Sequence, residues 1–336
     1  SSFLSLGLEL RARGEAYANP DWGGGTSTEH YLWTRALPYV DFHLGPHVRL
    51  FGQAIGAWSE FKETADTGVD ETGIELLQGF AEFDVSMNDT TSLTLRGGRQ
   101  LLSYGSERLI SLRYGPNVLR SFDAGLASVQ AGPWRVDAFY ARPVRNKVES
   151  FNDRHDTEKS VWSAYATGEI QEIRSGLDVY YIGYRNDEAA FDQGEGREHR
   201  HTLGSRLFGS AAAWDWNHEA MLQVGRFADA NILAWSIASD TGYSFKNTMF
   251  EPRLGLRANI ISGDRDPDRH NLQTFNPLFP KGKYFGESGL IGPSNLINLH
   301  PSVALHLNEQ WTLQGAAVFY WRESLADGVY DAGGNL

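Results

Sequence analysis

The chain has 336 residues, of which 41% are hydrophobic and 12% aromatic, and its formal net charge is −12. It contains no cysteine, which excludes disulfide scaffolds, zinc–cysteine sites and thiol catalysis. The acidic balance argues against a nucleic-acid-binding protein, because a surface that follows phosphates needs an excess of Lys and Arg. The composition favours a large, aromatic-rich, all-β protein, and no run of about 18 apolar residues indicates a membrane-spanning helix.

Alternation of apolar and polar residues is the strongest pattern in the chain, and it begins at once. Between Leu4 and Ala12 the even positions are apolar, whereas the odd positions carry small or charged residues such as Glu9 and Arg11. A period of two indicates a β-strand with one apolar and one polar face. The same pattern returns in residues 32–43, 48–59, 77–85, 214–224, 253–260, 302–307 and 311–322.

About fifteen such segments follow one another, each about ten residues long, which is the length that a tilted strand needs to cross a bilayer. Short turns such as Leu44–His47 alternate with long polar connections, among them residues 19–29, 61–73 and 263–295. This asymmetry is typical of outer-membrane barrels. We therefore predict a transmembrane antiparallel β-barrel in the bacterial outer membrane, with its apolar face toward outer-membrane lipid.

Aromatic residues at the ends of these segments support the same interpretation, because interfacial girdles of Trp and Tyr flank membrane-spanning elements. The residues predicted to belong to such girdles are Trp33, Trp58, Trp134, Trp214, Trp311, Tyr320 and Trp321. A soluble β-sandwich is the alternative, since its strands also alternate. Its second face would carry many Lys, Glu and Thr residues, whereas the polar positions here hold Arg, Asp, Glu, Gln, His and Gly.

The polar face of the predicted strands would line the lumen, and it is rich in arginine. In the structural interpretation, Arg and acidic residues form ion-pair ladders that stiffen the wall. In the functional one, the arginines attract anions as a selectivity filter. The structural and the functional interpretation are compatible, and the sequence does not decide between them. The strand residues concerned are Arg11, Arg13, Arg35, Arg49, Arg253 and Arg257, with the acidic Glu82 and Asp84.

Catalytic motifs are missing from the sequence, which has no nucleophile elbow, P-loop, zinc-protease motif or dinucleotide fingerprint. Glu82 and Asp84 share a strand face, as the paired carboxylates of a glycosidase would, but nothing completes such a site. The acidic run from Asp264 to Asp268 lacks the glycine and the closing glutamate of a calcium loop. We expect no enzymatic activity, no metal and no cofactor.

Two stretches of the chain resemble the alginate-export family of bacterial outer-membrane proteins. The first is carried by Gly98-Arg99-Gln100, Tyr104-Gly105-Ser106-Glu107-Arg108-Leu109, Pro116-Asn117 and Arg120-Ser121-Phe122-Asp123. The second is carried by Ser262-Gly263-Asp264-Arg265-Asp266-Pro267, Phe275-Asn276-Pro277-Leu278-Phe279-Pro280 and Tyr284-Phe285-Gly286. The resemblance implies an eighteen-stranded outer-membrane barrel whose arginine-rich lumen lets alginate leave the cell.

The resemblance also points to particular residues. It implies a pore-facing role for Arg99 and Gln100. Strict alternation would turn Arg99 outward, whereas a bulge at Gly97-Gly98 would return it inward. Arg108 and Arg120 lie in a long segment between strands, which either folds into the pore as a constriction or forms an external lid packed on its own side chains.

We expect residues 1–336 to form a single outer-membrane β-barrel domain that lacks its last C-terminal strands. About fifteen strands is an odd number, whereas bacterial single-chain barrels are even, and residues 326–336 have the composition of a loop. The predicted function is passive export of an anionic polysaccharide such as alginate. The alternatives are a substrate-selective uptake porin for small anions or sugars, and a surface adhesin. Periplasmic export proteins are further expected partners, and nucleic acid is not.

Overall fold

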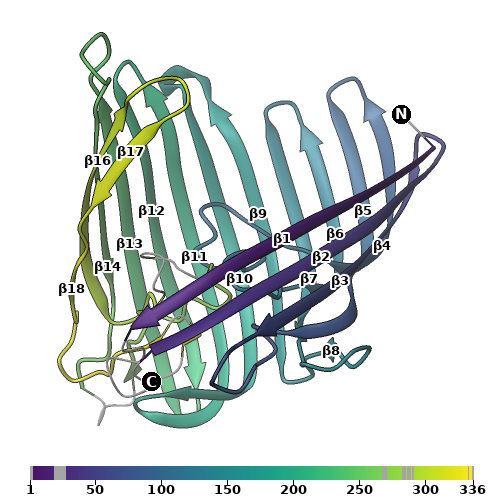
Figure 1. Cartoon of the computed structure of the whole chain (residues 1–336), viewed down its shortest axis with the longest axis horizontal. Coiled ribbons are helices and arrows are strands. Elements are labelled where there is room, and N and C mark those ends of the chain that lie inside the picture. The colour runs from purple at the N-terminus through teal and green to yellow at the C-terminus, as the bar shows by residue number, and fades with distance from the viewer. Residues whose placement is uncertain are drawn as a thin grey trace. The chain divides into compact units, whose positions relative to one another are not determined.

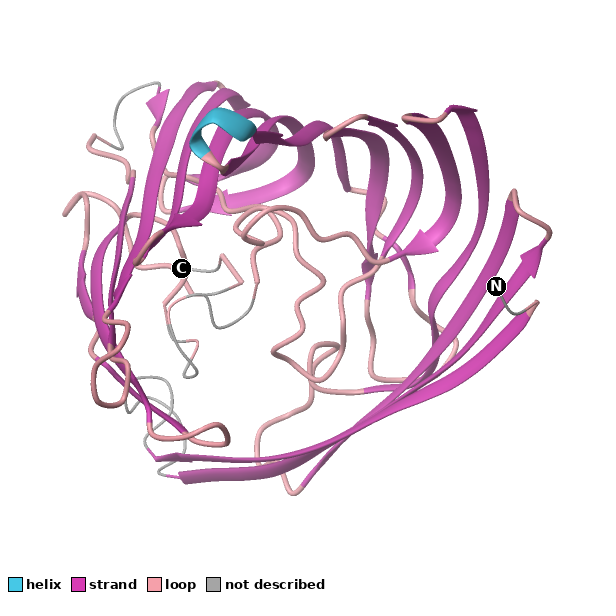
Figure 2. Cartoon of the chain, turned by 90° about the horizontal axis from the view of Figure 1, so that it is seen from above, coloured by secondary structure: helices cyan, strands magenta, loops and turns pink. Residues whose placement is uncertain are grey.

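The computed structural model describes residues 3–18, 28–266, 271–281, 285, 289, 291–331 and 333–334. Within these residues, eighteen strands belong to one sheet. Helix is confined there to the short 3₁₀ turn η2 (Gln171–Ile173), drawn in cyan in Figure 2. No helix of the described ranges is long and apolar enough to cross a membrane. The predicted all-β class is confirmed, and fifteen of the eighteen strands have at least five residues.

The chain divides into two compact units, which are described separately. Unit 1 comprises Ser1–Ala131, Asp137–Trp162 and Leu278–Tyr284, and unit 2 comprises Gly132–Val136, Ser163–Pro277 and Phe285–Leu336. The strands of residues 3–162 are β1 (Leu4–Ala18), β2 (Thr28–Leu44), β3 (Val48–Glu60), β4 (Thr72–Asn88), β5 (Thr91–Gln100), β6 (Phe122–Ala131), β7 (Trp134–Arg145) and β8 (Arg154–His155).

The later strands begin with β9 (Lys159–Ile170), which contributes residues to both units, as β7 does. The others are β10 (Ser175–Phe191), β11 (Gly194–Ala211), β12 (Trp214–Phe227), β13 (Ala230–Ser244), β14 (Arg253–Ile261), β15 (Asn271–Leu272), β16 (Leu296–His306), β17 (Thr312–Ala316) and β18 (Phe319–Trp321).

In unit 1, β1 to β6 pair antiparallel in chain order (Figure 1). The even positions of β1 form an exposed apolar face, where Leu6 and Leu10 are 72% and 71% exposed. The opposite face of the same strands carries Arg11 and Arg35, which lie directly across from each other. The period-two pattern of the sequence thus becomes two faces of different chemistry.

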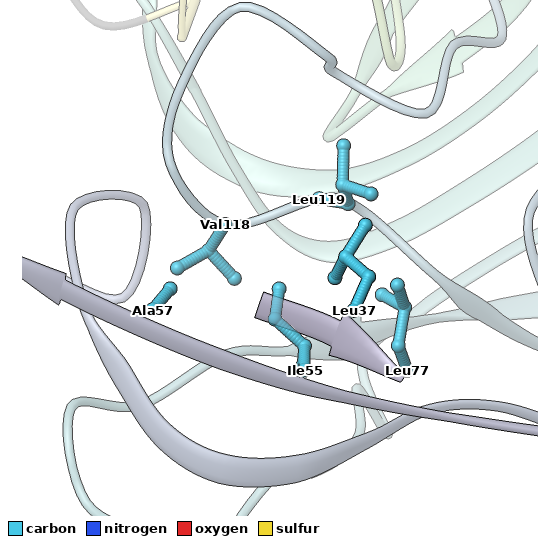
Figure 3. Close-up of a cluster of buried hydrophobic side chains, with 6 residues drawn as sticks. All are labelled: Leu37, Ile55, Ala57, Leu77, Val118 and Leu119. Atoms are coloured by element: carbon cyan, nitrogen blue, oxygen red, sulfur yellow. The ribbon is translucent and has the colours of Figure 1, made fainter. Parts of the chain in front are cut away.

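Segment 101–121, which joins β5 to β6, packs on the polar face of unit 1. Its Val118 and Leu119 meet a set of apolar residues that the strands place among the charged ones (Figure 3). The residues of this buried cluster are Leu37, Ile55, Ala57, Leu77, Val118 and Leu119. The segment therefore rests on the wall of strands and does not pack on its own side chains alone.

Unit 2 repeats this arrangement with different residues. Consecutive strands from β10 to β14 pair antiparallel, and β14 pairs with β16. Leu203, Leu233 and Ile237 are exposed on one face. The two-residue β15 pairs parallel with Asn231 and Ile232 of β13. Its Leu272 packs in a buried cluster with Ala189, Phe227 and Ile232.

One residue that was expected in an aromatic girdle is buried on the polar face instead. Trp33 is 7% exposed and packs against Tyr31, with ring centroids 4.8 Å apart. Its odd position in β2 places it on the same face as Arg35, so the prediction for Trp33 is wrong. Trp58 and Trp214 are exposed, as the prediction requires.

Candidate functional site: the polar faces of the two units

A ladder of ion pairs crosses β2 to β5 on the polar face of unit 1. Arg49 of β3 donates from Nε and Nη2 to the two carboxylate oxygens of Asp41, at 2.8 and 3.0 Å. Its Nη1 lies 3.5 Å from Glu82 Oε1, and Arg96 Nε donates to Glu82 Oε2 at 2.6 Å. Bidentate Arg–carboxylate pairs fix both side chains in one plane. The ladder therefore presents a row of paired charges.

Glu82 and Asp84 do share this face, but both carboxylates are engaged. Glu82 accepts hydrogen bonds from Arg49 and Arg96, and Asp84 accepts one from the hydroxyl of Thr94. A glycosidase needs one carboxylic acid and one carboxylate poised on either side of a substrate. Two carboxylates held on one strand face by arginines and a threonine do not provide that arrangement.

Arg11 and Arg13 of β1 hold the tip of segment 101–121. Arg11 donates from Nη1 to Tyr114 O at 3.0 Å and from Nη2 to Pro116 O at 2.9 Å. Arg13 Nη1 donates to Gly115 O at 3.2 Å. A guanidinium offers five N–H donors in a fixed fork, so one side chain can satisfy several loop carbonyls. These two arginines position the loop.

Arg35 is the deepest of the predicted arginines, since its side chain is fully buried. Nη2 donates to Glu9 Oε1 at 2.8 Å, and Nη1 donates to Asn117 O at 3.2 Å. The guanidinium also lies 4.9 Å from the centroid of the Tyr114 ring. Burying a charge without partners is costly, so these contacts are what make the position possible.

Arg108 and Arg120 also lie within unit 1. Arg108 is buried, and the guanidinium of Arg120 lies 5.3 Å from the centroid of the Phe279 ring. Arg120 Nη1 donates to Pro280 O at 3.4 Å. Segment 278–281 thus joins the motif of residues 98–123, and a parallel bridge between Ile110 and Phe279 completes the connection.

A bulge at Gly97-Gly98, which would turn Arg99 inward, is absent, because β5 pairs with both neighbours without a register shift there. Arg99 therefore keeps the outward direction of strict alternation, and the pore-facing prediction for Arg99 is corrected. It forms an ion pair with Asp123, with Nε 2.8 Å from Oδ1. Gln100 lies on the opposite face, where its side chain is buried and Nε2 donates to Ala124 O at 3.1 Å.

A cavity of about 550 Å³ adjoins Arg99 on the apolar side of unit 1. Ile74, Leu76 and Phe151 line it, and all three are exposed. Arg99 Nη1 donates to Leu76 O at 3.2 Å. The exposed apolar lining is a second sign that Arg99 belongs to this side.

Arg253 and Arg257 of β14 are half-buried and paired. Arg253 Nε and Nη2 donate to the two oxygens of Asp215, at 2.9 and 2.5 Å. Arg257 donates from Nε and Nη2 to Asp240 Oδ2, at 3.2 and 3.1 Å. About a third of each arginine side chain is exposed, at 31% and 34%. They combine a fixed position with access for a solute.

Sequence reasoning missed the most deeply buried charged network, which lies in unit 2. Arg200 Nε contacts Glu198 Oε1 at 2.5 Å, and its Nη1 donates to Gln223 Oε1 at 2.8 Å and to Thr274 O at 3.2 Å. Asn276 Nδ2 donates to both oxygens of Glu198, at 3.1 Å each. The available signal was the spacing of two between Glu198 and Arg200, which places opposite charges on one strand face.

The acidic run that begins at Asp264 forms part of an ordered loop cluster. Asp264 N and Thr274 Oγ1 both donate to Asp327 Oδ2, at 2.8 and 2.6 Å, and Tyr330 OH donates to Asp327 Oδ1 at 2.7 Å. Burial and the nearby Asp327 raise the pKa of Asp264. Pro267 and Asp268 of this run, and Tyr284 and Gly286 of the second motif, lie outside the described residues. Among the residues that the structure describes, no three acidic or histidine side chains are grouped as metal ligands.

Comparison with known proteins assigns the chain to a family. The family described as "Alginate export" matches residues 2–336. The chain belongs to the alginate export family. The predicted resemblance is thereby confirmed over essentially the whole sequence, whereas no curated protein matches the chain.

Two solved structures show the fold. OccK2 (OpdF) of Pseudomonas aeruginosa, crystallised with glucuronate, is similar at a TM-score of 0.56 and 15% identity, covering 90% of this chain and 75% of that one. OprB of Pseudomonas putida is similar at 0.52 and 10% identity, covering 94% and 89%. The fold of this alginate-export protein is that of outer-membrane porin barrels. Family and fold together indicate an outer-membrane channel rather than an enzyme.

Proposed function

We propose that this alginate-export protein is a passive outer-membrane channel that exports an anionic polysaccharide such as alginate. The observation that carries the proposal is the pair of arginines on β14, which are held in place by Asp215 and Asp240 while about a third of each side chain stays accessible. Family membership over residues 2–336 supports the polymer as the solute.

The ion pairs fit conduction better than tight binding. An arginine that is partly neutralised by a carboxylate attracts a uronate weakly, so a polymer can exchange one contact for the next. Arg49, Arg253 and Arg257 are all paired in this way. By contrast, Arg11 and Arg35 bind loop carbonyls, so we assign them to loop positioning and not to solute contact.

The test is single-channel recording in planar bilayers with a polyuronate on one side. We expect the polymer to block the current reversibly, and we expect Arg253→Glu with Arg257→Glu to reduce the preference for chloride over potassium. The matched control is Arg99→Glu, because this arginine lies on the apolar face. A current that polyuronate never blocks would rule out the export function.

An uptake porin for small acids is the second candidate, because OccK2, which shares the fold, was solved with glucuronate. Liposome swelling separates the two functions. A small-acid porin would admit glucuronate readily while polyuronate leaves its current unaffected, whereas a polymer channel shows the block. The adhesin alternative and the periplasmic partners stay predictions.

A further inference from the structure

Aromatic side chains form a continuous strip on the polar face of unit 1, where the neighbouring residues are charged. The strip consists of Tyr39 of β2, Phe51 of β3 and Phe80 of β4. Ring centroids are 5.8 Å apart between Tyr39 and Phe51 and 5.2 Å apart between Phe51 and Phe80. The ring planes differ by 25° and 23°, so the rings are nearly parallel. None of the three belongs to the apolar cluster that holds segment 101–121. Phe80 is buried, at 8% exposed, so it supports the strip while Tyr39 and Phe51 stay accessible.

Gly7 of β1 provides the seat for one end of the strip. A Cβ at this position would lie 2.2 Å from Cε1 and 2.5 Å from the hydroxyl oxygen of Tyr39. The ring therefore lies directly over the glycine and would be displaced by any side chain there. Tyr39 nevertheless remains 37% exposed. One side of the ring is supported by the strand while part of it stays accessible to a solute.

The charged residues around the strip balance one another. Arg49 lies 5.1 Å from the Phe51 centroid, and Arg96 lies 4.5 Å from the Phe80 centroid. Each arginine is paired with a carboxylate, Asp41 for Arg49 and Glu82 for Arg96. The formal charges of these four side chains therefore cancel. Among the described residues, Arg96 Nη1 meets no acceptor, which leaves its two N–H groups for a ligand.

This combination matches the chemistry of a sugar ring better than that of a simple ion. An ion gains little from a surface without net charge and nothing from an aromatic ring that already lies beside a guanidinium. A pyranose has an apolar C–H face that can pack on an aromatic ring, and a rim of hydroxyls that carboxylates and guanidinium groups can bind.

We infer that Tyr39 and Phe51, backed by the buried ring of Phe80, form a binding subsite for the pyranose rings of a uronic-acid polymer, which is recognised by ring face and hydroxyls more than by charge. The inference rests on the proposed function and names how its substrate is recognised. Arg96 would take the carboxylate of a bound uronate, and Asp41 would accept from its hydroxyls.

The experiment measures the block of single-channel current by a uronate oligosaccharide and by a neutral oligosaccharide of equal length. In Phe51→Leu and Tyr39→Leu, we expect the concentration for half-block to rise about threefold to tenfold for both sugars, which is the range of one aromatic contact. Phe83→Leu is the matched control, because Phe83 lies on the exposed apolar face of β4. Phe51→Tyr keeps the ring, so the sugars should block its current at the same concentrations as in the original protein.

Gly7→Ala tests the same subsite without removing an aromatic residue. It should also raise the sugar concentration that gives half-block. The inference is overturned if the original protein is blocked by the uronate but the leucine and Gly7→Ala variants are blocked equally well. It is also overturned if the block weakens in the variants only together with the chloride preference. If the original protein is never blocked by any uronate oligomer or polymer, the proposed function itself fails.

Discussion

Two arginines with fully buried side chains, Arg35 in unit 1 and Arg200 in unit 2, each bind a loop carbonyl and a glutamate, but the glutamates differ. The side chain of Glu9 is 46% exposed, whereas that of Glu198 is 0% exposed. If Glu9 is removed, water can enter its space and hydrogen-bond to Arg35. The space of Glu198 is closed to solvent, so its removal leaves Arg200 without a replacement partner unless the structure rearranges. We therefore expect the Arg35–Glu9 pair of unit 1 to contribute less to stability than the Arg200–Glu198 pair of unit 2.

The largest expected effect breaks the buried pair. Glu198→Ala leaves Arg200 buried without its carboxylate, which should lower the free energy of unfolding by about 3–5 kcal/mol. The matched change Glu9→Ala removes a half-exposed partner and should cost less, because water can enter the space that Glu9 leaves beside Arg35. Urea unfolding in detergent, followed by loss of the β-sheet circular dichroism signal, measures both. Equal losses in the two variants would contradict the comparison.

The next largest effect comes from removing apolar contacts of two loops, segment 101–121 in unit 1 and the loop that contains β15 in unit 2. Leu119→Ala opens a cavity between segment 101–121 and its cluster, and about 2–4 kcal/mol of stability should be lost. Leu272→Ala in unit 2 should cost a similar amount. Both loops keep arginine contacts to their backbone, from Arg11 to Pro116 O and from Arg200 to Thr274 O. Limited proteolysis checks this, since neither variant should be cleaved much faster within residues 101–121 or 271–281, and rapid cleavage there would contradict it.

The smallest effect concerns two loop carboxyls whose pKa burial raises, Asp264 in unit 2 and Asp153 in unit 1. Asp264 Oδ2 is buried without a hydrogen-bond partner among the described residues. Asp153 instead accepts from Asn146 Nδ2 at 2.8 Å and from Lys147 N at 2.7 Å. Asp264→Asn should therefore stabilise the protein slightly at pH 7, whereas Asp153→Asn should not.

The pH dependence has a definite sign. A carboxyl whose folded pKa is raised above the unfolded value of about 3.9 favours folding below that value and loses this contribution as the pH rises through the folded pKa. The advantage of Asp264→Asn over the original protein should therefore be present at pH 7 and shrink as the pH falls toward 4. Thermal unfolding at several pH values measures it, and an advantage that grows on acidification would refute the assignment.

Alternation predicted the strands well because the side-chain period of a strand is fixed by its geometry. The odd and even positions of β1 separated as expected, and Arg49 and Glu82 met on one face. Trp33 shows the limit of the pattern. The predicted segment began at residue 32, whereas β2 begins at Thr28 and places Trp33 inside the strand. Arg99 shows a second limit, since paired glycines permit a bulge but do not require one.

The alternation of apolar and polar residues could not predict contacts between distant segments of the chain. Asn117 donates from Nδ2 to Thr34 O and Trp58 O, at 3.1 and 3.0 Å, and these residues are 83 and 59 positions away. Whether Arg11 faces a solute or a loop carbonyl depends on where segment 101–121 comes to rest. The sequence therefore predicted which residues are polar and inward, but not which of them the loops would occupy.

The central claim is that an anionic polysaccharide passes through this protein, and transport from proteoliposomes tests it most directly. Vesicles that contain the protein are loaded with polyuronate and a small dye, and external uronic acid is measured over time. We predict protein-dependent release of the polymer, which becomes slower in Phe51→Leu. Release of the dye while all the polyuronate stays inside would contradict the claim.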